Sequence, residues 1–387
     1  MMAPPAGPTP PEGLVPGLPG RYYTDEDHFA RERRLVFARS WQCVDRAEAL
    51  AEPGRFLVYP AGDDSVLVIR GKDDRLRAFH NVCRHRGARL CTEETGATGA
   101  LGKSVRCMYH GWSYALDGRL TAAPNLADLP PGAREQLGLV PVRAQEWLGY
   151  LWVNLDGQAP PLPETAGRRA AAVLGSPAKL DRYGVGALRR ASSITYDVAA
   201  NWKVITENFM ECYHCAPLHP QLTAVLPQFA SGYGTMTGAA PDGAAFAAGR
   251  GYSLSGRAAG PRLPGLEPGD GQLHALVLYP TAFLVLTPDH VAVYRLNPVS
   301  AGRTTLVVDT MFAPGHSESD DFDPDDTISL RDLTVRQDIE AVERCQLGMR
   351  SSAYQGVLVP AEHAIIGFYR DVLGSLGEPL PPAYEPG

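Results

Sequence analysis

The chain has 387 residues, 44% of them hydrophobic and 20% charged, which is enough for more than one folded domain. Its formal net charge of -7 argues against binding to nucleic acid or to an anionic membrane, because both are themselves negatively charged. The opening residues show no basic segment followed by an apolar one, so we predict no signal peptide and a cytoplasmic protein. In such a protein the seven cysteines indicate reduced thiols, used if at all as metal ligands or in catalysis.

The N-terminal part of the chain predicts a leader, a helix and a small β domain. Residues 1–20 are rich in proline and glycine and predict a disordered leader. Residues 21–40 predict an N-terminal helix, since their apolar residues have roughly helical spacing, and we expect this helix to pack on the larger, C-terminal domain. Residues 41–158 carry short apolar runs separated by turn residues, with a hairpin signal at Asp117-Gly118. They predict a small antiparallel β domain.

A proline-containing linker, residues 156–165, leads to a second domain at residues 168–387. This domain contains a helical segment, "NWKVITENFMECYHC", then several strand-like runs and a closing helix from about Thr327 to Met349. The segment from Phe229 to Gly271 is rich in glycine and alanine without periodicity, so we predict a lid or a disordered loop. Together the two domains predict an α+β protein.

The β domain contains two matched pairs of candidate metal ligands. They are Cys83 and His85 in "NVCRHRGARL", and Cys107 and His110 in "VRCMYHGWSY". Each pair lies on a turn between two predicted strands, so both members of a pair can point at one metal centre. Two thiolates and two imidazoles at these spacings suit tetrahedral zinc or a Rieske [2Fe–2S] cluster, in which two histidines replace two cysteines on one iron.

Two features favour the cluster over zinc. Zinc fingers usually pair cysteine with cysteine on short modules, whereas each pair here combines cysteine with histidine in a domain of about a hundred residues. Mixed pairs suit a binuclear cluster in which each loop gives one ligand to each iron. Tyr109 and Trp112 lie on the second loop and can shield the cluster from water.

With these motifs and the segment "ENFMECYHCAPLHP" (residues 207–220), the chain resembles the oxygenase (alpha) subunits of Rieske non-haem iron oxygenases. The resemblance extends from "LPGRYYTDEDHF" to the closing helix. It implies a small antiparallel β Rieske domain and a helix-grip (START-like) catalytic domain with an antiparallel sheet. It also implies mononuclear Fe²⁺ beside the [2Fe–2S] cluster, a separate flavin- or ferredoxin-type reductase, and a homotrimer.

The histidine-rich segment supplies candidates for the second iron. On a continuous helix Glu207, Glu211 and His214 share one face, because they are four and three residues apart. His219 leaves that face on an undistorted helix, and we predict that Pro217 ends or kinks the helix and lets His219 turn back. Two converging histidines and one carboxylate form the 2-His-1-carboxylate site of Fe(II) oxygenases.

Asp338 is the predicted carboxylate ligand. It lies in a helical apolar stripe with Val335 and Val342, where a lone buried carboxylate is costly unless it binds a cation. It also matches the aspartate of the corresponding helix in the family. The alternative for Asp338 is a buried salt bridge to Arg336 or Arg344.

The resemblance assigns roles to Glu211 and Asn208. In the family, an acidic residue three positions before the first iron histidine connects that histidine to a cluster histidine of a neighbouring subunit. This makes Glu211 an electron bridge from His85 or His110 to His214, and Asn208 is placed among the catalytic residues. Most ring-hydroxylating members carry aspartate at the bridge, so glutamate here is more like the glycine betaine, proline betaine and carnitine oxygenases.

The resemblance implies an enzyme that uses O₂ and reductase-supplied electrons from NAD(P)H to hydroxylate a small organic substrate. We expect N-demethylation of a quaternary ammonium compound such as a betaine, and aromatic-ring hydroxylation is the alternative. An electron-transfer Rieske protein is a further alternative, but it leaves His214, His219 and Asp338 without a role. A quaternary ammonium ion needs an aromatic cage. The candidates for it are Tyr213, Tyr252, Tyr279 and Phe283.

Cys212 and Cys215 have the spacing of a redox dithiol or a zinc pair. A thioredoxin-type pair belongs at a helix start after a strand, whereas this pair lies at the end of a predicted helix. We therefore predict that both residues are small core thiols.

Overall fold

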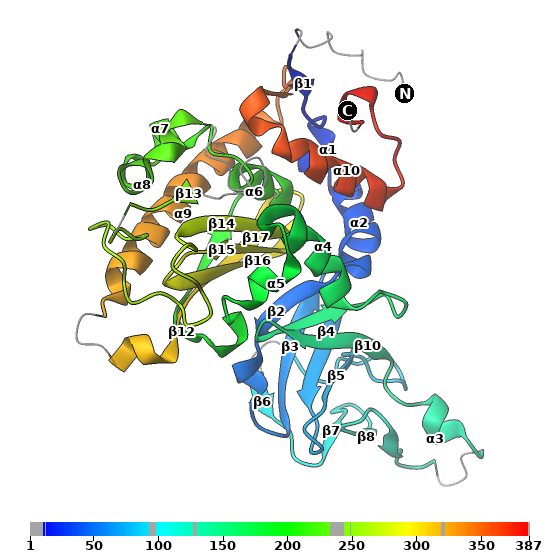
Figure 1. Cartoon of the computed structure of the whole chain (residues 1–387). Helices are drawn as coiled ribbons and strands as arrows, with labels where there is room; N and C mark the ends of the chain where they lie inside the picture. The colour runs from blue at the N-terminus through cyan, green and yellow to red at the C-terminus, as the bar shows by residue number, and fades with distance from the viewer. Residues whose placement is uncertain are drawn as a thin grey trace. The chain divides into compact units, whose positions relative to one another are not determined.

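Figure 1 shows the computed structural model of the chain, which describes residues 11, 13–92, 98–126, 130–232, 244–247, 249–318 and 322–385. The chain divides into two compact units. One unit is Phe37–Pro163, and the other combines Met1–Val36 with Glu164–Gly387. The boundary between Pro163 and Glu164 lies inside the segment that the sequence marks as a linker.

The described part of the first unit is built on an antiparallel sheet with the strand order β2-β11-β10-β5-β4-β3-β6. The strands are β2 (Gln42–Arg46), β3 (Arg55–Ala61), β4 (Asp64–Arg70), β5 (Leu76–His80), β6 (Thr98–Ala100), β10 (Pro141–Trp147) and β11 (Tyr150–Asn154). Alternate side chains of a strand point to opposite faces. Along β3, Phe56 and Val58 enter one apolar core while Leu57 and Tyr59 enter another, so both faces of this sheet are covered.

A smaller antiparallel sheet carries the second pair of predicted cluster ligands. Its strands are β7 (Ser104–Arg106), β8 (Ser113–Ala115) and β9 (Leu120–Ala122), followed by the helix α3 (Ala133–Gln136). The predicted turn at Asp117-Gly118 connects β8 to β9, and Gly118 has a φ of 89°, which glycine adopts without steric cost. Val105 and Tyr114 share an apolar core with Phe79 of β5, which joins this sheet to the larger one.

The described part of the second unit contains an antiparallel sheet with the order β12-β17-β16-β15-β14-β13. The strands are β12 (Arg189–Val198), β13 (Ala244–Ala245), β14 (Gln272–Leu278), β15 (Ala282–Leu286), β16 (His290–Ser300) and β17 (Arg303–Phe312). The strand-like runs of the sequence correspond to β14–β17 and are confirmed. The long edge strand β12 is missed by the sequence reasoning because most of its side chains are polar or exposed.

Helices of the second unit place the candidate site against this sheet. They are α4 (Leu162–Leu174), α5 (Pro177–Asp181), α6 (Trp202–Phe209), α7 (Cys215–Leu218), α8 (Pro220–Val225), α9 (Pro324–Gly348) and α10 (Ala364–Leu376). The long helix α9 packs against α6 and β12, and α6 also contacts β16. Among the described residues, none of the helices combines the length and hydrophobicity that spanning a lipid bilayer requires.

The N-terminal segment packs within the second unit. Strand β1 (Val15–Pro16) pairs with β18 (Val357–Leu358), so the predicted disorder of residues 1–20 is wrong for this part of the leader. A short strand can form here because the proline at its edge needs no ladder hydrogen bond from its nitrogen. Residues 1–10 and 12 lie outside the described residues.

A buried ion pair connects the N-terminal helices to the site. Helix α1 (Arg21–Thr24) precedes α2 (Glu26–Leu35), which covers most of the helix expected in residues 21–40. Lys203 Nζ in α6 lies 2.5 Å from Glu32 Oε1 in α2, and both side chains are fully buried. The Glu32 carboxylate also accepts the Trp202 indole N–H at 2.9 Å. These contacts hold α2 against the helix that precedes the histidine-rich segment.

Candidate functional site

Two loops of the first unit repeat one hydrogen-bond pattern around the predicted cluster cysteines. In each loop the cysteine N–H donates to the carbonyl five residues later, and the glycine N–H four residues later donates back to the cysteine carbonyl. The pairs are Cys83 N–Ala88 O (2.8 Å), Gly87 N–Cys83 O (3.1 Å), Cys107 N–Trp112 O (2.7 Å) and Gly111 N–Cys107 O (3.1 Å). The C-x-H and C-x-x-H motifs therefore fold into matching loops.

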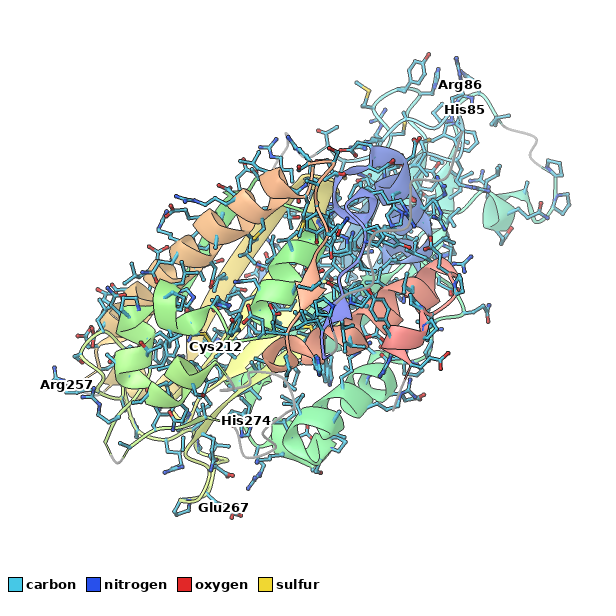
Figure 2. The ribbon with its side chains drawn as sticks, turned by 90° about the horizontal axis from the view of Figure 1, so that it is seen from above. His85, Arg86, Cys212, Arg257, Glu267 and His274 are labelled. Atoms are coloured by element: carbon cyan, nitrogen blue, oxygen red, sulfur yellow. A yellow bond between two sulfur atoms is a disulfide. The ribbon has the colours of Figure 1, made fainter. Side chains whose placement is uncertain are left out.

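The four predicted cluster ligands separate into a buried pair and an exposed pair. Cys83 and Cys107 are 4% and 2% exposed and form no disulfide. His85 and His110 are exposed, with ring centroids 4.6 Å apart, and His85 lies beside Arg86 on its loop (Figure 2). Two thiolates and two imidazoles on these loops are the donor set of a Rieske [2Fe–2S] cluster.

The two aromatic residues on the second loop, Tyr109 and Trp112, differ in burial. The Trp112 ring is buried and stacks on His85, with centroids 5.0 Å apart and an interplanar angle of 7°. Tyr109 is 53% exposed, although its ring contacts that of His110. Of the two aromatic residues expected to shield the cluster, only Trp112 is buried.

Tyr114 supplies a contact to a cluster cysteine that the sequence reasoning missed. Its hydroxyl lies 3.2 Å from Cys83 Sγ and accepts the backbone N–H of Arg84 at 3.0 Å. Because the N–H of Arg84 takes one acceptor site of the hydroxyl, the hydroxyl proton can be donated to the sulfur. Burial and the neighbouring Cys83 raise the pKa of Tyr114, which keeps this proton in place.

In the second unit, Glu211 lies outside any helix. Helix α6 ends at Phe209, and Glu211 Oε2 then accepts the backbone N–H groups of Tyr213 and, at 3.2 Å, of His214. A carboxylate that binds nearby backbone N–H groups competes with helix formation and stabilises a turn. The prediction that Glu207, Glu211 and His214 line one helix face is therefore wrong.

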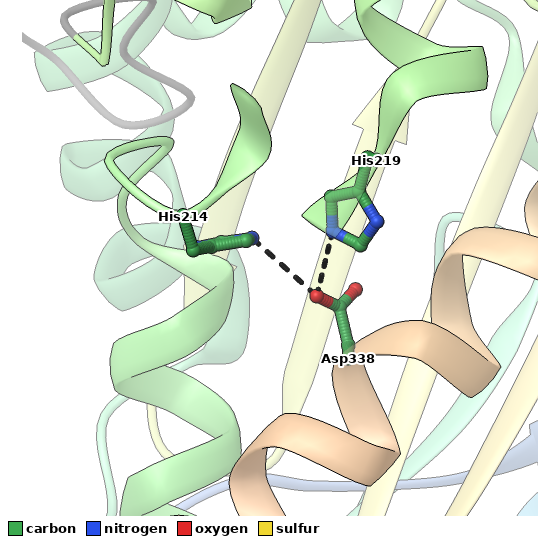
Figure 3. A group of neighbouring side chains, drawn as sticks. All are labelled: His214, His219 and Asp338. Atoms are coloured by element: carbon green, nitrogen blue, oxygen red, sulfur yellow. Dashed lines mark hydrogen bonds and ion pairs between the residues drawn. The ribbon is translucent and has the colours of Figure 1, made fainter. Parts of the chain in front are cut away.

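The predicted iron ligands His214, His219 and Asp338 are nevertheless brought together (Figure 3). Asp338 Oδ1 lies 3.4 Å from His214 Nε2 and 2.9 Å from His219 Nε2. Two ligands bonded to one ion at about 2.0–2.2 Å can lie at most about 4.4 Å apart, so both of these separations are compatible with a shared metal ion. Two imidazoles and one carboxylate are the donor set of a non-haem Fe(II) site.

The chain turns toward the site at His219 rather than at Pro217. Pro217 lies inside the short helix α7, so it is not the helix breaker that the sequence suggested. His219 leaves helical geometry with a φ of -120° and a ψ of 63°, and Pro220 begins α8. The residue before a proline is disfavoured in the helical conformation, which explains the change of direction at this position.

Hydrogen bonds fix both histidine rings. His214 Nδ1 lies 2.5 Å from Glu211 Oε1, and His219 Nδ1 lies 2.8 Å from Gln337 Oε1. Since both partners are oxygen acceptors, each Nδ1 carries the proton and each Nε2 is left for a metal. Burial lowers the pKa of His214, but Asp338 and Glu211 outweigh it and raise this pKa to about 10. The site therefore favours positive charge, as a cation-binding site should.

Asp338 is not held by an arginine. Among the described residues, Arg336 pairs with Asp332 at 2.9 Å and Arg344 pairs with Glu340 at 2.5 Å, so the salt-bridge alternative is wrong. The Asp338 side chain is 29% exposed rather than fully buried, because it faces a cavity. Burial raises the pKa of Asp338, but the two histidines outweigh this effect and lower it.

A cavity opens onto the three candidate ligands. Its volume is about 60 Å³. Much of its lining is apolar or aromatic and includes Phe209, Phe229, Tyr252, Tyr294, Val285 and Val335. Asn208 also lines it, and its Nδ2 lies 3.5 Å from His214 Nε2.

The candidate cage residues differ in their positions. Tyr252 lines this cavity and Phe283 lines an adjoining one. Tyr213 is 57% exposed, and Tyr279 packs against Trp202 and Phe368 away from both cavities.

The segment expected to form a lid is described only in part, because residues 233–243 and 248 lie outside the described residues. Phe229 and Tyr252 from its described part line the cavity. Whether the segment forms a lid stays a prediction.

Cys212, in the turn after α6, forms a disulfide with Cys215, the first residue of α7 (Figure 2 labels Cys212). Both are 2% exposed, as expected for core residues. The prediction that they are reduced thiols is wrong, because the turn brings their Cα atoms to 4.9 Å, within bonding range.

Two protein families match the chain. The Rieske [2Fe-2S] domain matches residues 40–133, and the ring hydroxylating alpha subunit (catalytic domain) matches residues 185–378. The chain belongs to the ring-hydroxylating oxygenase alpha-subunit family. It is an oxidoreductase with a Rieske [2Fe–2S] domain and a catalytic domain that binds mononuclear iron. An oxygenase subunit of such a multicomponent system acts on a small molecule and receives its electrons from a separate reductase.

Individual relatives span both domains. The carnitine monooxygenase oxygenase subunit of Escherichia coli is 31% identical, covering 88% of this chain and 86% of the relative. The glycine betaine monooxygenase oxygenase subunit of Chromohalobacter salexigens is 32% identical, covering 87% of this chain and 80% of the relative. A solved quaternary ammonium Rieske monooxygenase matches with a TM-score of 0.72 and 25% identity, over 94% of this chain and 95% of the other. These similarities confirm the predicted family and fold class.

Proposed function

We propose that this oxygenase hydroxylates a carbon atom bonded to the nitrogen of a quaternary ammonium compound, with an N-methyl group as the expected position. The observation that carries the proposal is the aromatic-lined cavity beside His214, His219 and Asp338. It lies in a chain that is similar over most of its length to carnitine and glycine betaine monooxygenase subunits. Aromatic faces attract quaternary ammonium ions, and several aromatic side chains line this cavity.

His214, His219 and Asp338 would hold the iron that activates O₂, and Cys83, His85, Cys107 and His110 would hold the [2Fe–2S] cluster that supplies electrons. The overall reaction consumes O₂, two electrons and two protons, and it forms water and an N–CH₂OH group. That group then breaks its C–N bond and gives formaldehyde, a tertiary amine and a proton. Glu211 and Gln337 hold the Nδ1 protons of the two histidines, while the apolar lining excludes water from the reacting carbon.

The proposal includes a homotrimer located in the cytoplasm, in which Glu211 connects His214 to a cluster histidine of a neighbouring subunit. Glu211 Oε1 accepts one imidazole N–H from His214, and a carboxylate oxygen can accept a second one. His85 and His110 are exposed, which leaves their rings accessible to such a contact. Both facts support the proposed electron route between subunits.

The substrate is tested by turnover of the purified protein with a surrogate reductase on a panel of betaines and aromatic compounds. Oxygen consumption, formaldehyde and product mass are measured together. Formaldehyde release from a betaine supports the proposal. Release of the intact amine without formaldehyde contradicts the methyl position, because it places the oxidised carbon in the chain of the substrate. Turnover of aromatic compounds alone overturns the proposed substrate class.

A further inference from the structure

We propose that Arg331 binds a carboxylate of the substrate, so that the enzyme selects quaternary ammonium compounds that also carry a carboxylate. This inference rests on the proposed function, since it names the anionic group of the same substrate. Arg331 and Asp338 both lie in α9 and both line the cavity. They are seven residues apart, so they share a helix face and lie about 10 Å apart along its axis.

Arg331 is a buried cation without an anionic partner. It is 2% exposed, and its guanidinium donates to the Tyr294 hydroxyl at 3.1 Å and to His290 Nε2 at 2.7 Å. Its guanidinium also lies over the Tyr252 ring, 4.4 Å from the centroid. Among the described residues, Nε of Arg331 has no hydrogen-bond partner and no carboxylate forms an ion pair with this side chain. A buried charge without a counter-ion is costly, which indicates that the anion arrives with the ligand.

The residues behind Arg331 orient it without neutralising it. Asp289 Oδ1 lies 2.8 Å from His290 Nδ1, and the other ring nitrogen of His290 accepts from Arg331. Burial lowers the pKa of His290 more than Asp289 raises it, so the ring is neutral and serves as an acceptor for Arg331. The Asp289 carboxylate also accepts hydrogen bonds from the backbone N–H of Ala259 and the hydroxyl of Thr287. A neutral ring therefore separates Asp289 from the guanidinium.

The charged guanidinium of Arg331 lies apart from the candidate iron ligands. Asp338 and Glu211 lie at the end that holds the candidate iron ligands, and Arg331 lies further along the same helix face. The guanidinium covers a face of the Tyr252 ring, so Tyr252 is a poor choice for an ammonium cage, whereas Phe209 and Tyr294 also line the cavity. A zwitterion with ammonium and carboxylate groups at its two ends matches this arrangement.

The test measures binding rather than turnover, by calorimetry on the anaerobic holoenzyme without reductase. The probes are gamma-butyrobetaine, its carboxamide and the corresponding alcohol, which share one trimethylammonium group and differ in the other end. We expect wild type to bind the carboxylate roughly 10- to 100-fold more tightly than the amide or the alcohol. Arg331→Met should bind all three with similar affinity, and Arg331→Lys should retain part of the preference. Arg344→Met, an exposed arginine of the same helix, should behave as wild type.

Each outcome separates this inference from the proposed function. If Arg331→Met keeps the full preference for the carboxylate, or if wild type binds all three probes equally, the role of Arg331 is overturned while ammonium binding stands. If wild type binds none of the three probes, the role of Arg331 is likewise overturned, and turnover of the betaine panel tests the proposed function separately. The visible spectrum of the cluster and the melting temperature report folding of each variant. Should Arg331→Met not fold, the comparison of probes on wild type and on Arg331→Lys still decides the question.

Discussion

Glu211 orients His214 with both of its carboxylate oxygens. Oε1 lies 2.5 Å from His214 Nδ1, and Oε2 accepts the backbone N–H of His214 at 3.2 Å. Ring and backbone are thus held by one side chain, and His214 Nε2 is left 3.4 Å from Asp338 Oδ1. Glu211 therefore controls the geometry of a candidate metal ligand from outside the donor set, and such outer partners tune both affinity and reactivity.

Glu211→Gln tests whether this carboxylate also forms part of the electron-transfer route to the mononuclear site. Glutamine keeps an oxygen acceptor for His214 Nδ1 but removes the negative charge and one acceptor oxygen. We expect both metal centres to be retained and the reduction of the mononuclear site to slow, with turnover about 10- to 100-fold lower. Rapid-mixing single-turnover experiments and iron analysis measure the two effects separately. Glu340→Gln is the control, since Glu340 is 68% exposed. Unchanged turnover in Glu211→Gln refutes the bridging role.

Asp338→Ala tests the assignment of the mononuclear iron site. The variant removes the carboxylate that lies within 3.4 Å of both histidine Nε2 atoms. We expect iron content to fall by about one atom per chain and turnover to be lost, while the visible spectrum of the cluster remains. The matched control is Asp332→Asn on the same helix, where the carboxylate pairs with Arg336. Survival of both iron content and turnover in Asp338→Ala means that the ligand assignment is wrong.

Residues whose chemistry follows a local pattern could be predicted from the sequence. The stripe that contains Asp338 reflects the period of a long regular helix, and α9 forms with nearly the expected ends. The two cysteine–histidine pairs lie on short loops, where spacing in the sequence restricts spacing in space. Family and fold class followed from these motifs, and both are confirmed.

Other parts of the site depend on contacts that no local pattern shows. Glu211 has helical spacing from Glu207, yet its side chain binds the next backbone N–H groups and α6 stops at Phe209. Arg331 was missed because its partners, Tyr294 and His290, lie on β16, 37 and 41 residues earlier. The sequence shows only that Arg331 lies on a predicted helix. Its contact with the neutral ring of His290 depends on how β16 packs against that helix.

Tyr114→Phe tests the hydrogen bond between Tyr114 and a cluster ligand. The hydroxyl lies 3.2 Å from Cys83 Sγ, and a donor to a cluster sulfur stabilises the reduced, more negative state. We expect the variant to keep the cluster and to have a lower reduction potential, by an amount on the order of tens of millivolts. A spectroscopic redox titration measures this shift. Tyr59→Phe is the control, because Tyr59 lies in the separate apolar core on the other face of the sheet. Equal potentials in Tyr114→Phe and wild type contradict the predicted donation.

Glu207 makes the stability of the second unit depend on pH. Its Oε1 accepts the Tyr23 hydroxyl at 2.7 Å. Burial raises the pKa of Glu207 to about 8, although Tyr23 and Lys203 act in the opposite direction. Between its ordinary pKa of 4.5 and this value, the folded chain holds a proton that the unfolded chain has released. The contribution of Glu207 to the free energy of unfolding therefore falls as pH rises through this window, and it falls no further above the folded pKa.

Glu207→Gln removes the ionisable group while keeping an oxygen that accepts from Tyr23. The variant and wild type should therefore differ little in stability near pH 5. There Glu207 is protonated in the folded wild type, and its raised pKa lowers the free energy of unfolding only slightly. The variant should become the more stable of the two toward pH 8, by about 1–3 kcal/mol. Thermal unfolding of both proteins at several pH values between 5 and 8 measures this divergence, and Glu340→Gln supplies an exposed control. Parallel stability curves would mean that Glu207 is already ionised in the folded chain at pH 5, with Lys203 and Tyr23 outweighing its burial.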